Sequence, residues 1–361
     1  MTRRPIRVLV VDDSRLMRRL LVDLLSASSA IEVVGTAQDA QQARAEIKRL
    51  APDVITLDVE MPGMSGLQFL ARLMRLRPLP VVMVSSRTHE GSAAALDALA
   101  LGAVDVIAKP QGVREAGLAC FAAALQAKVL QAAAVPVEQL TRMTGPGEGD
   151  APHEPPSAAG PYGGIVAIGA STGGTEAIRS VLRRLPANMP PILLVQHIPL
   201  AFSGSLARRL DAECSLRVVH LTQTQPLRPG HAYLAGGERH MVVERLGTTT
   251  CARPDDAPAR QHHRPSVDIL FETLARQPLR LAAVLLTGMG TDGAAGLARL
   301  RQRGALTLAQ DEASSMVWGM PGEAVRIGAA QEVLPLSAIA ARLLRWTHER
   351  RAAARTHAAG R

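Results

Sequence analysis

Short apolar runs alternate with amphipathic, helix-forming segments through the first third of the chain. Strands are predicted near residues 6–11, 31–36, 53–58, 80–85 and 103–108, and helical segments begin near residues 14, 38, 65, 91 and 113. Strand–helix alternation at this spacing predicts a doubly wound α/β domain with a five-stranded parallel sheet. Its functional site is expected at the carboxyl ends of the strands.

A second series of apolar runs begins after a stretch rich in proline and glycine. The run from Ile165 to Ala170 breaks into a glycine-rich turn and a helix-forming segment near 173–184. Two further buried strands are predicted at 191–196 and 281–286, and each ends in a loop with polar side chains. We therefore expect a second doubly wound, mostly parallel α/β domain.

Between the two series the composition changes. Residues 113–134 are rich in alanine and have a helical period, whereas the stretch from Val135 to Gly164 collects prolines and glycines. That composition cannot bury a core and predicts an exposed linker. The expected organisation is a first domain over 1–127, a linker over 128–160, a second domain over 161–348 and a basic tail over 349–361.

Length and composition agree with two soluble domains. The chain has 361 residues, of which 47% are hydrophobic and 20% charged. No apolar segment approaches the ~18–20 residues of a membrane span, and Asp12 and Asp13 interrupt the first apolar run too early for a secretion signal. Cys120, Cys214 and Cys251 lack the spacing of a zinc site or a disulfide framework, which favours a reducing cytoplasm.

The net charge of +9 raises the question of nucleic-acid binding. Aromatic residues make up only 2% of the chain, and the arginines are spread along it apart from an arginine-rich tail from Arg345 to Arg361. Attraction to an acidic protein surface explains the charge at least as well. We expect no nucleic-acid partner and no membrane insertion.

Polar residues gather at the predicted strand ends of the first domain. Asp12 and Asp13 follow the first strand, Asp58 ends the third, Ser85 ends the fourth and Lys109 follows the fifth. Three carboxylates at one edge repel each other unless a divalent cation lies among them, and oxygen ligands of this kind suit Mg²⁺. A lysine opposite would pair with a carboxylate or with an incoming phosphoryl group. Singly, each acid could be a loop or cap residue; their coincidence favours a site.

Over residues 4–127 this pattern resembles a response-regulator receiver domain. The resemblance implies that Asp58 accepts a phosphoryl group from a histidine kinase and that Ser85 and Lys109 contact the phosphate. The implied Mg²⁺ ligands are oxygens of Asp12, Asp13, Asp58 and the backbone carbonyl of Glu60. Val106 stands where the family usually has an aromatic residue that reports phosphorylation.

The loops after the three predicted strands of the second domain carry Ser171, His197 and Asp292. In a parallel sheet these three ends face one crevice. Serine becomes a nucleophile when a base takes its proton, and imidazole does so when a carboxylate fixes its tautomer and stabilises the imidazolium. The three form a candidate acyl-transfer triad. Gly169 and Gly173 complete a G-x-S-x-G turn, although the chain order serine, histidine, aspartate differs from that of α/β-hydrolases.

Five motifs make the resemblance of the second domain specific. They are GASTGG at 169–174, QHIP at 196–199, PSVD at 265–268, LTGMGTDG at 286–293 and GMPGEA at 319–324. Together they resemble the chemotaxis protein-glutamate methylesterases over about residues 161–348. The resemblance, with the receiver pattern, covers nearly the whole chain.

This resemblance implies phosphorylation-regulated hydrolysis of glutamate γ-methyl esters on chemotaxis receptors. Ser171 would attack the ester, His197 would act as general base and then acid, and Asp292 would orient His197. The backbone N–H of Met289 would stabilise the oxyanion, joined by that of Thr172 at the helix start. Ester hydrolysis needs no cofactor. Related enzymes also deamidate receptor glutamines, with ammonia leaving instead of methanol, and the expected partners are these receptors and a chemotaxis histidine kinase.

Non-enzymatic alternatives remain open at this point. A receiver-linked transcription factor would explain the basic charge but needs a helix-turn-helix, whereas the second half is strand-rich. A catalytically silent adaptor would lack one triad residue, and all three are present. A nucleotide-binding effector is disfavoured because the strand at 191–196 offers no acidic residue at its end.

Overall fold

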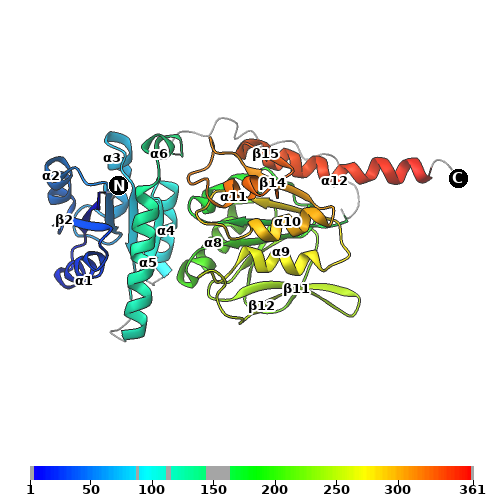
Figure 1. Ribbon diagram of the computed structural model, residues 1–361, viewed down its shortest axis with the longest axis horizontal. Coiled ribbons are helices and arrows are strands. Elements are labelled where there is room, and N and C mark those ends of the chain that lie inside the picture. Colours follow the sequence, from blue (N-terminus) through cyan, green and yellow to red (C-terminus); the bar gives the residue numbers. More distant parts are fainter. Residues whose placement is uncertain (1–3, 87–88, 111–114, 144–162, 359–361) are drawn as a thin grey trace. The chain divides into compact units, whose positions relative to one another are not determined.

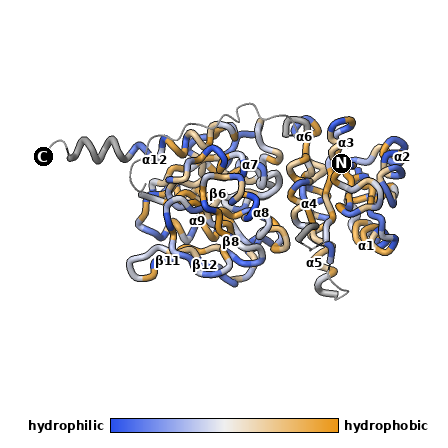
Figure 2. Tube along the Cα trace, turned by 180° about the vertical axis from the view of Figure 1, so that it is seen from behind, coloured by the Kyte–Doolittle hydropathy of each residue, from blue (hydrophilic) through white to orange (hydrophobic). Residues whose placement is uncertain are grey.

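The computed structural model describes residues 4–86, 89–110, 115–143 and 163–358. The chain divides into two compact units, Met1–Glu148 and Gly149–Arg361, and each is described here by itself (Figure 1). Within the described ranges, no helix is both long and apolar enough to cross a membrane. Hydrophilic residues gather on outer helices such as α2 (Figure 2).

The first unit is a five-stranded parallel sheet in the order β2-β1-β3-β4-β5. Its strands are β1 Ile6–Val11, β2 Ile31–Ala37, β3 Val54–Asp58, β4 Val81–Ser85 and β5 Asp105–Ala108. The helices that follow them are α1 Arg15–Ser26, α2 Ala40–Leu50, α3 Gly66–Leu76, α4 His89–Ala100 and α5 Glu115–Ala133. The predicted fold class is confirmed, and every predicted strand is present.

The start of the expected linker requires a correction. Residues 128–133 belong to α5, and a further helix, α6, spans Val137–Met143. Val135 is 4% exposed and Leu140 is fully buried, so these two apolar side chains hold the segment in the core of the first unit. The prolines and glycines that predicted the linker lie mostly between 144 and 162, outside the described residues. At the other end of the chain, α12 (Leu336–Ala358) continues as a helix into the residues expected as a basic tail.

The second unit is organised around a seven-stranded parallel sheet in the order β15-β14-β13-β6-β7-β10-β8. Its strands are β6 Ile165–Ala170, β7 Ile192–Gln196, β8 Arg217–Leu221, β10 His231–Ala235, β13 Leu281–Leu285, β14 Leu306–Gln310 and β15 Glu332–Leu334. A separate antiparallel sheet contains β9 Gln225–Pro226, β11 His240–Leu246 and β12 Thr249–Asp255. The second doubly wound α/β domain is thereby confirmed.

Helices cover both faces of the seven-stranded sheet. They are α7 Gly174–Leu182, α8 Leu200–Glu213, α9 Val267–Ala275, α10 Ala294–Gln302, α11 Met320–Arg326 and α12. One face packs against α9, α10 and α11 in a core that includes Phe271, Leu297 and Met320. Because β6 is buried on both faces, it is a continuous apolar run rather than an alternating one.

The register of the central strands brings three loops together. In β6, Ala170 lies opposite Gln196 of β7, and Gly169 lies opposite Leu285 of β13. The residues that follow these strands therefore leave the sheet side by side at one edge. The Ser171 N–H donates to the carbonyl of Thr287 at 3.0 Å, which ties two of the loops to each other.

Replacing either of two glycines of the first unit by alanine is expected to change stability, in opposite directions. A Cβ on Gly66, at the start of α3, would collide with the backbone carbonyl oxygen of Asp58, whereas a Cβ on Gly117 in α5 would meet nothing within 4 Å. We expect Gly66→Ala to destabilise the unit by about 1–3 kcal/mol, because backbone must shift. Gly117→Ala should stabilise it by up to about 1 kcal/mol through helix propensity. Urea unfolding of both variants checks this, and equal effects of one sign would contradict it.

Candidate functional sites

The first site lies at the carboxyl ends of β1 and β3. Asp12 is fully buried, Asp58 is 1% exposed and Asp13 is exposed. One carboxylate oxygen from each of the three lies within 4.8 Å of the others. The sequence prediction that these side chains converge is met by this geometry.

Lys109 supplies the positive charge at this edge. Its Nζ lies 2.7 Å from Asp58 Oδ2 and 3.0 Å from Asp12 Oδ2. Burial lowers the pKa of Lys109, but the hydrogen bond to Asp58 and the two carboxylate charges raise it, and the net shift is upward. The lysine therefore stays charged while it faces the acids.

The charged form of Asp58 is destabilised by its surroundings. Burial raises its pKa, the hydrogen bond from Lys109 lowers it and the charge of Asp12 raises it, with a net value of about 6 against an ordinary 3.8. The backbone N–H of Glu60 donates to Asp58 Oδ1 at a long 3.3 Å. One lysine does not offset two buried carboxylates, so this edge favours further positive charge.

The donor set fits a magnesium ion. Asp12 Oδ2 is buried and lies 3.0 Å from Lys109 Nζ, the same ammonium group that contacts Asp58. Hard oxygen ligands, with some positions left to water and phosphate, are what Mg²⁺ requires. Ser85 ends β4 and is buried, and its hydroxyl donates to the carbonyl of Ser86 at 3.4 Å. Glu60 directs its carboxylate to the Ser86 hydroxyl at 2.9 Å.

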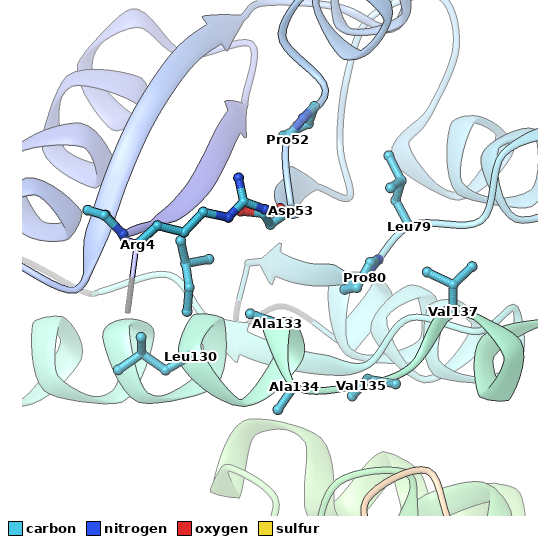
Figure 3. A pocket seen from close by; sticks show the side chains of 12 residues that line it. Arg4, Pro52, Asp53, Leu79, Pro80, Leu130, Ala133, Ala134, Val135 and Val137 are labelled. Carbon is cyan, nitrogen blue, oxygen red and sulfur yellow. Dashed lines mark hydrogen bonds and ion pairs between the residues drawn. The ribbon is translucent and has the colours of Figure 1, made fainter. Parts of the chain in front are cut away.

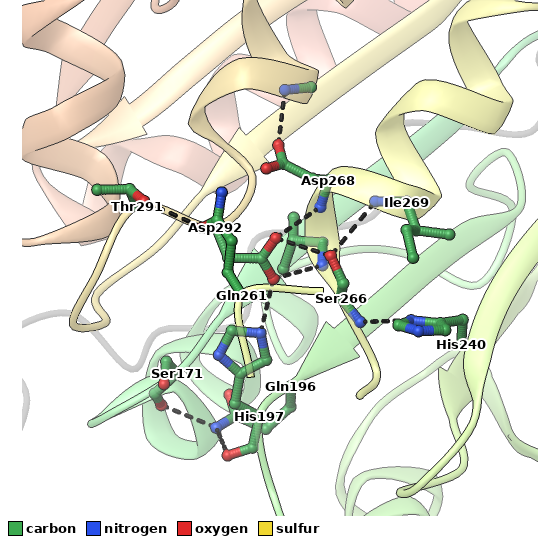
Figure 4. A network of polar contacts seen from close by, with 12 residues as sticks. Ser171, Gln196, His197, His240, Gln261, Ser266, Asp268, Ile269, Thr291 and Asp292 are labelled. Carbon is green, nitrogen blue, oxygen red and sulfur yellow. Dashed lines mark hydrogen bonds and ion pairs between the residues drawn. The ribbon is translucent and has the colours of Figure 1, made fainter. Parts of the chain in front are cut away.

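The second site lies where β6, β7 and β13 end. Ser171 is the first residue after β6, His197 the first after β7, and Asp292 lies in the loop between β13 and α10. Gly288 packs directly on the serine, since a Cβ there would lie 2.7 Å from the Cβ of Ser171. Figure 4 shows the His197 ring between Asp292 and Ser171.

Asp292 is fully buried, and four protein groups hydrogen-bond to its carboxylate. Its Oδ2 lies 2.9 Å from His197 Nε2 and accepts from the Val267 N–H at 2.7 Å, while its Oδ1 accepts from the Ser266 hydroxyl at 2.8 Å and the Asp268 N–H at 3.0 Å (Figure 4). Burial raises its pKa, but the bond and charge of His197 and the two backbone donors outweigh this and lower the pKa to about 2. Asp292 therefore remains an anion at neutral pH.

This bond leaves one imidazole nitrogen for chemistry. His197 Nδ1 is buried and has no hydrogen-bond partner. With Nε2 held by Asp292, Nδ1 is the nitrogen available to accept a proton from a hydroxyl in the crevice. Sequence reasoning brought serine, histidine and aspartate together but left open which nitrogen faces which neighbour.

Backbone donors line the same crevice. The N–H groups of Thr172 and Met289 make no hydrogen bond to any residue that the structure describes. Gly173 caps α7 with φ of 74° and without a side-chain acceptor. The Gly174 N–H donates to the Ser171 carbonyl at 2.7 Å, whereas the Thr175 and Glu176 N–H groups make no hydrogen bond to a described residue, as is usual in the first turn of a helix. Met289 is 36% exposed, which places its amide on an accessible loop.

Three residues of this site were missed as contributors by sequence reasoning. Gln196 donates through Nε2 to the carbonyls of Ser171 at 2.8 Å and His197 at 3.3 Å, which clamps the two loops together. Ser266 holds Asp292, as described above. The ring of His263 stacks on that of His197 with centroids 4.0 Å apart and planes at 6°. Gln196 and Ser266 lie inside the quoted motifs, but nothing in the local pattern marks His263.

Comparisons with known proteins find a family match for each of the two units. The CheB methylesterase family model matches residues 166–343, and the response regulator receiver domain model matches residues 8–117. A protein from Hahella chejuensis named protein-glutamate methylesterase/protein-glutamine glutaminase 1 is 49% identical over 349 residues, covering 95% of this chain and 97% of the relative. A Chromohalobacter salexigens protein of the same name, without the numeral, is 49% identical over 96% of this chain and 97% of its own.

One solved structure supports the second unit in particular. The crystal structure of the Thermotoga maritima CheB methylesterase catalytic domain is 34% identical in sequence and has a TM-score of 0.50. It covers 51% of this chain and 98% of that domain.

The raised pKa of Asp58 predicts how magnesium affects stability. A carboxyl whose folded pKa lies near 6 and whose ordinary value is 3.8 contributes stability that is present below the ordinary pKa and is lost as pH rises through about 6. We expect Mg²⁺ to raise the melting temperature of the first unit more at pH 7.5 than at pH 5. Differential scanning calorimetry of the full chain measures this.

Asp58→Asn should remove most of this pH-dependent response, because the stressed carboxylate is gone. The control Asp23→Asn changes an exposed aspartate of α1 that is not in the acidic cluster and should respond like the parent chain. A magnesium response in Asp58→Asn equal to that of the parent would show that the ion binds elsewhere.

Proposed function

Since the chain belongs to the CheB methylesterase family, we propose that it hydrolyses glutamate γ-methyl esters on chemotaxis receptors under the control of receiver phosphorylation. The observation that carries the proposal is the joint placement of Ser171, His197 and a fourfold hydrogen-bonded Asp292 at three adjacent strand ends. Such a constellation serves acyl transfer and has no evident purpose in a binding module.

The proposed reaction follows from the geometry. The Ser171 hydroxyl attacks the ester carbonyl while its proton passes to His197 Nδ1, and Asp292 stabilises the imidazolium through Nε2. The oxyanion accepts hydrogen bonds from the free amides of Met289 and Thr172. His197 then gives its proton to the methoxide oxygen, methanol leaves, and an acyl-serine remains. Water deprotonated by His197 attacks that ester and releases the glutamate carboxylate and the serine.

The same steps support deamidation. With a glutamine amide in place of the ester, His197 protonates the leaving nitrogen and ammonia departs, after which hydrolysis of the acyl-serine again gives glutamate. We propose that this chain shares the protein-glutamine glutaminase activity named for its relatives, since no group of the triad needs to differ between the two leaving groups. Neither reaction calls for a cofactor.

The receiver unit supplies the regulation in this proposal. Asp58 accepts a phosphoryl group from a phosphohistidine of a chemotaxis histidine kinase: its carboxylate oxygen forms the P–O bond as the P–N bond breaks. Lys109 and Ser85 contact the phosphoryl oxygens. A magnesium ion held by Asp12, Asp13, Asp58 and the Glu60 carbonyl supplies charge neutralisation when bound. The three cysteines are free, as suits a reducing cytoplasm, where we place the reaction.

The triad assignment predicts graded losses of methylesterase activity. Ser171→Ala should reduce turnover by about 10⁴-fold or more, because no acyl-serine can form. Asp292→Asn should also cost several orders of magnitude by disturbing the imidazole tautomer. Methanol release from methylated receptor membranes is the measurement, with circular dichroism as the folding check. Ser205→Ala removes a hydroxyl of α8 that bonds Arg208 and should leave activity unchanged. Undiminished turnover in Ser171→Ala would refute the triad.

The phosphorylation assignment makes a separate prediction. Asp58→Asn should abolish Mg²⁺-dependent labelling by a small phosphodonor and any change of esterase rate that the donor causes, while the unstimulated rate persists, since the triad residues lie in the other unit. Phosphate-affinity electrophoresis and the methanol assay, run on the same samples, measure the two effects. Aspartyl phosphate found in Asp58→Asn would place the acceptor at another residue.

A further inference from the structure

A groove of about 1110 Å³ runs between α2 and α3 of the first unit. Its floor contains Ile47, Phe69 and Leu73, which are 3%, 6% and 7% exposed. Leu76, at the end of α3, also lines it and is 71% exposed, so one large apolar side chain stands open to solvent at the groove. An apolar floor with an exposed leucine is a surface that gains from being covered.

The rim of the groove is strongly basic. Its cations are Arg44, Lys48, Arg72, Arg75 and Arg77. Within the described part of the chain none of these forms an ion pair; Arg72 and Arg77 contact only the Met64 sulfur at 3.7 Å and the Ile47 carbonyl at 3.4 Å. The one acid lining the groove, Asp39, already caps α2 by accepting from the Gln42 N–H at 2.8 Å. The positive charge of this groove is therefore not neutralised from within.

A second cleft of the same unit shows the contrast. It is lined by apolar side chains such as Leu130 and Ala133 together with Arg4 and Asp53 (Figure 3). Those two charges pair with each other at 2.9 Å. That cleft carries no net charge and gives no indication of what covers it, whereas the α2–α3 groove selects its occupant by charge.

We propose that the α2–α3 groove docks an acidic, amphipathic segment of a partner protein. Arg44 and Lys48 stand one turn apart on α2, and Arg72 and Arg75 stand one turn apart on α3. Two such basic edges beside an apolar floor fit a helix that presents leucine-like side chains downward and carboxylates to both sides. This docking does not depend on the proposed hydrolysis.

Other occupants fit less well. A second copy of this chain would bring a net charge of +9 against the basic rim. Single-stranded nucleic acid binds by stacking on exposed aromatic rings, and the aromatic side chain of this groove, Phe69, is buried. An anionic membrane would reach the rim cations but not the recessed floor. A segment of protein satisfies both the charges and the floor.

The test uses the full chain and a fluorescein-labelled 16-residue helical peptide with leucines at i, i+3, i+4 and i+7 and glutamates on the flanks. Fluorescence anisotropy at fixed ionic strength measures Kd. The variant Arg44→Glu/Lys48→Glu should raise Kd about tenfold or more, because two attractions become repulsions. The matched control Arg15→Glu/Arg19→Glu makes the same charge change at the same spacing on the exposed face of α1 and should change Kd by less than about twofold.

The apolar half of the proposal has its own pair of variants. Leu76→Gln should weaken binding about fivefold, whereas Leu16→Gln, at a leucine of α1 that is 80% exposed and outside the groove, should have no effect. Circular dichroism and thermal unfolding verify that all four variants are folded.

Three results would overturn the proposal. The first is equal weakening by the α1 and α2 charge variants, which would mean non-specific attraction. The second is a Kd unchanged from that of the parent chain in both the Leu76→Gln variant and the Arg44→Glu/Lys48→Glu variant. The third is failure of the peptide to bind while vesicles of phosphatidylglycerol and phosphatidylcholine bind in a groove-dependent way, which would assign the groove to a lipid surface.

Discussion

The parallel pairing of β13, β6 and β7 is the constraint on which the proposed esterase site depends. These strands are neighbours at the centre of the sheet, so Ser171, His197 and the loop of Asp292 leave it at one edge although they are far apart in sequence. Backbone hydrogen bonds then fix the loops: Ser171 N–H donates to Thr287, and Gln196 bridges the carbonyls of Ser171 and His197. A site built on strand ends inherits the rigidity of a buried sheet, which is what holding a nucleophile near its base requires.

Two buried aspartates show how this fold sets different chemistry with the same side chain. Asp292 receives four donors and its pKa falls to about 2, so it is a permanent anion suited to orienting an imidazolium. Asp58 receives Lys109 and one long amide contact beside a second carboxylate, and its pKa rises to about 6. Its carboxylate is poorly stabilised by the protein, and the proposed binding of a cation and transfer of a phosphoryl group would relieve this. The number of donors around each acid, rather than its burial, separates the two roles.

The sequence predicted the parts of the structure that depend on strong local periodicity. The five strands of the first unit and the three central strands of the second are mainly apolar, with Arg7 in β1 and Glu32 in β2 as interruptions, and they were found close to their observed ends. The region between His197 and Pro265 was not predicted. Its β8, β10, β11 and β12 are short or half-buried, and their pairing is decided by partners distant in sequence. Helix α6 was hidden because a proline-rich stretch surrounds it, while burial of Leu140 overrides that composition.

Contacts between residues distant in sequence also decided the features of the second site and of the surface charge that the sequence did not predict. The stacking of His263 on His197 joins a loop to a strand end that lies far from it in sequence, so no motif could announce it. The net charge of +9 likewise does not indicate where on the surface cations remain unpaired. In the second unit Glu272 pairs with Arg260 at 2.7 Å and Arg299 at 2.8 Å, and Arg342 pairs with Glu332 at 2.8 Å. In the described part of the first unit, the five cations at the rim of the α2–α3 groove form no such ion pair. The basic composition alone left nucleic acid and an acidic protein surface to be weighed, with the protein surface at least as good an explanation. The distribution of the charge over an apolar groove favours the protein surface, because only folding decides which charges are neutralised internally and which are left for a partner.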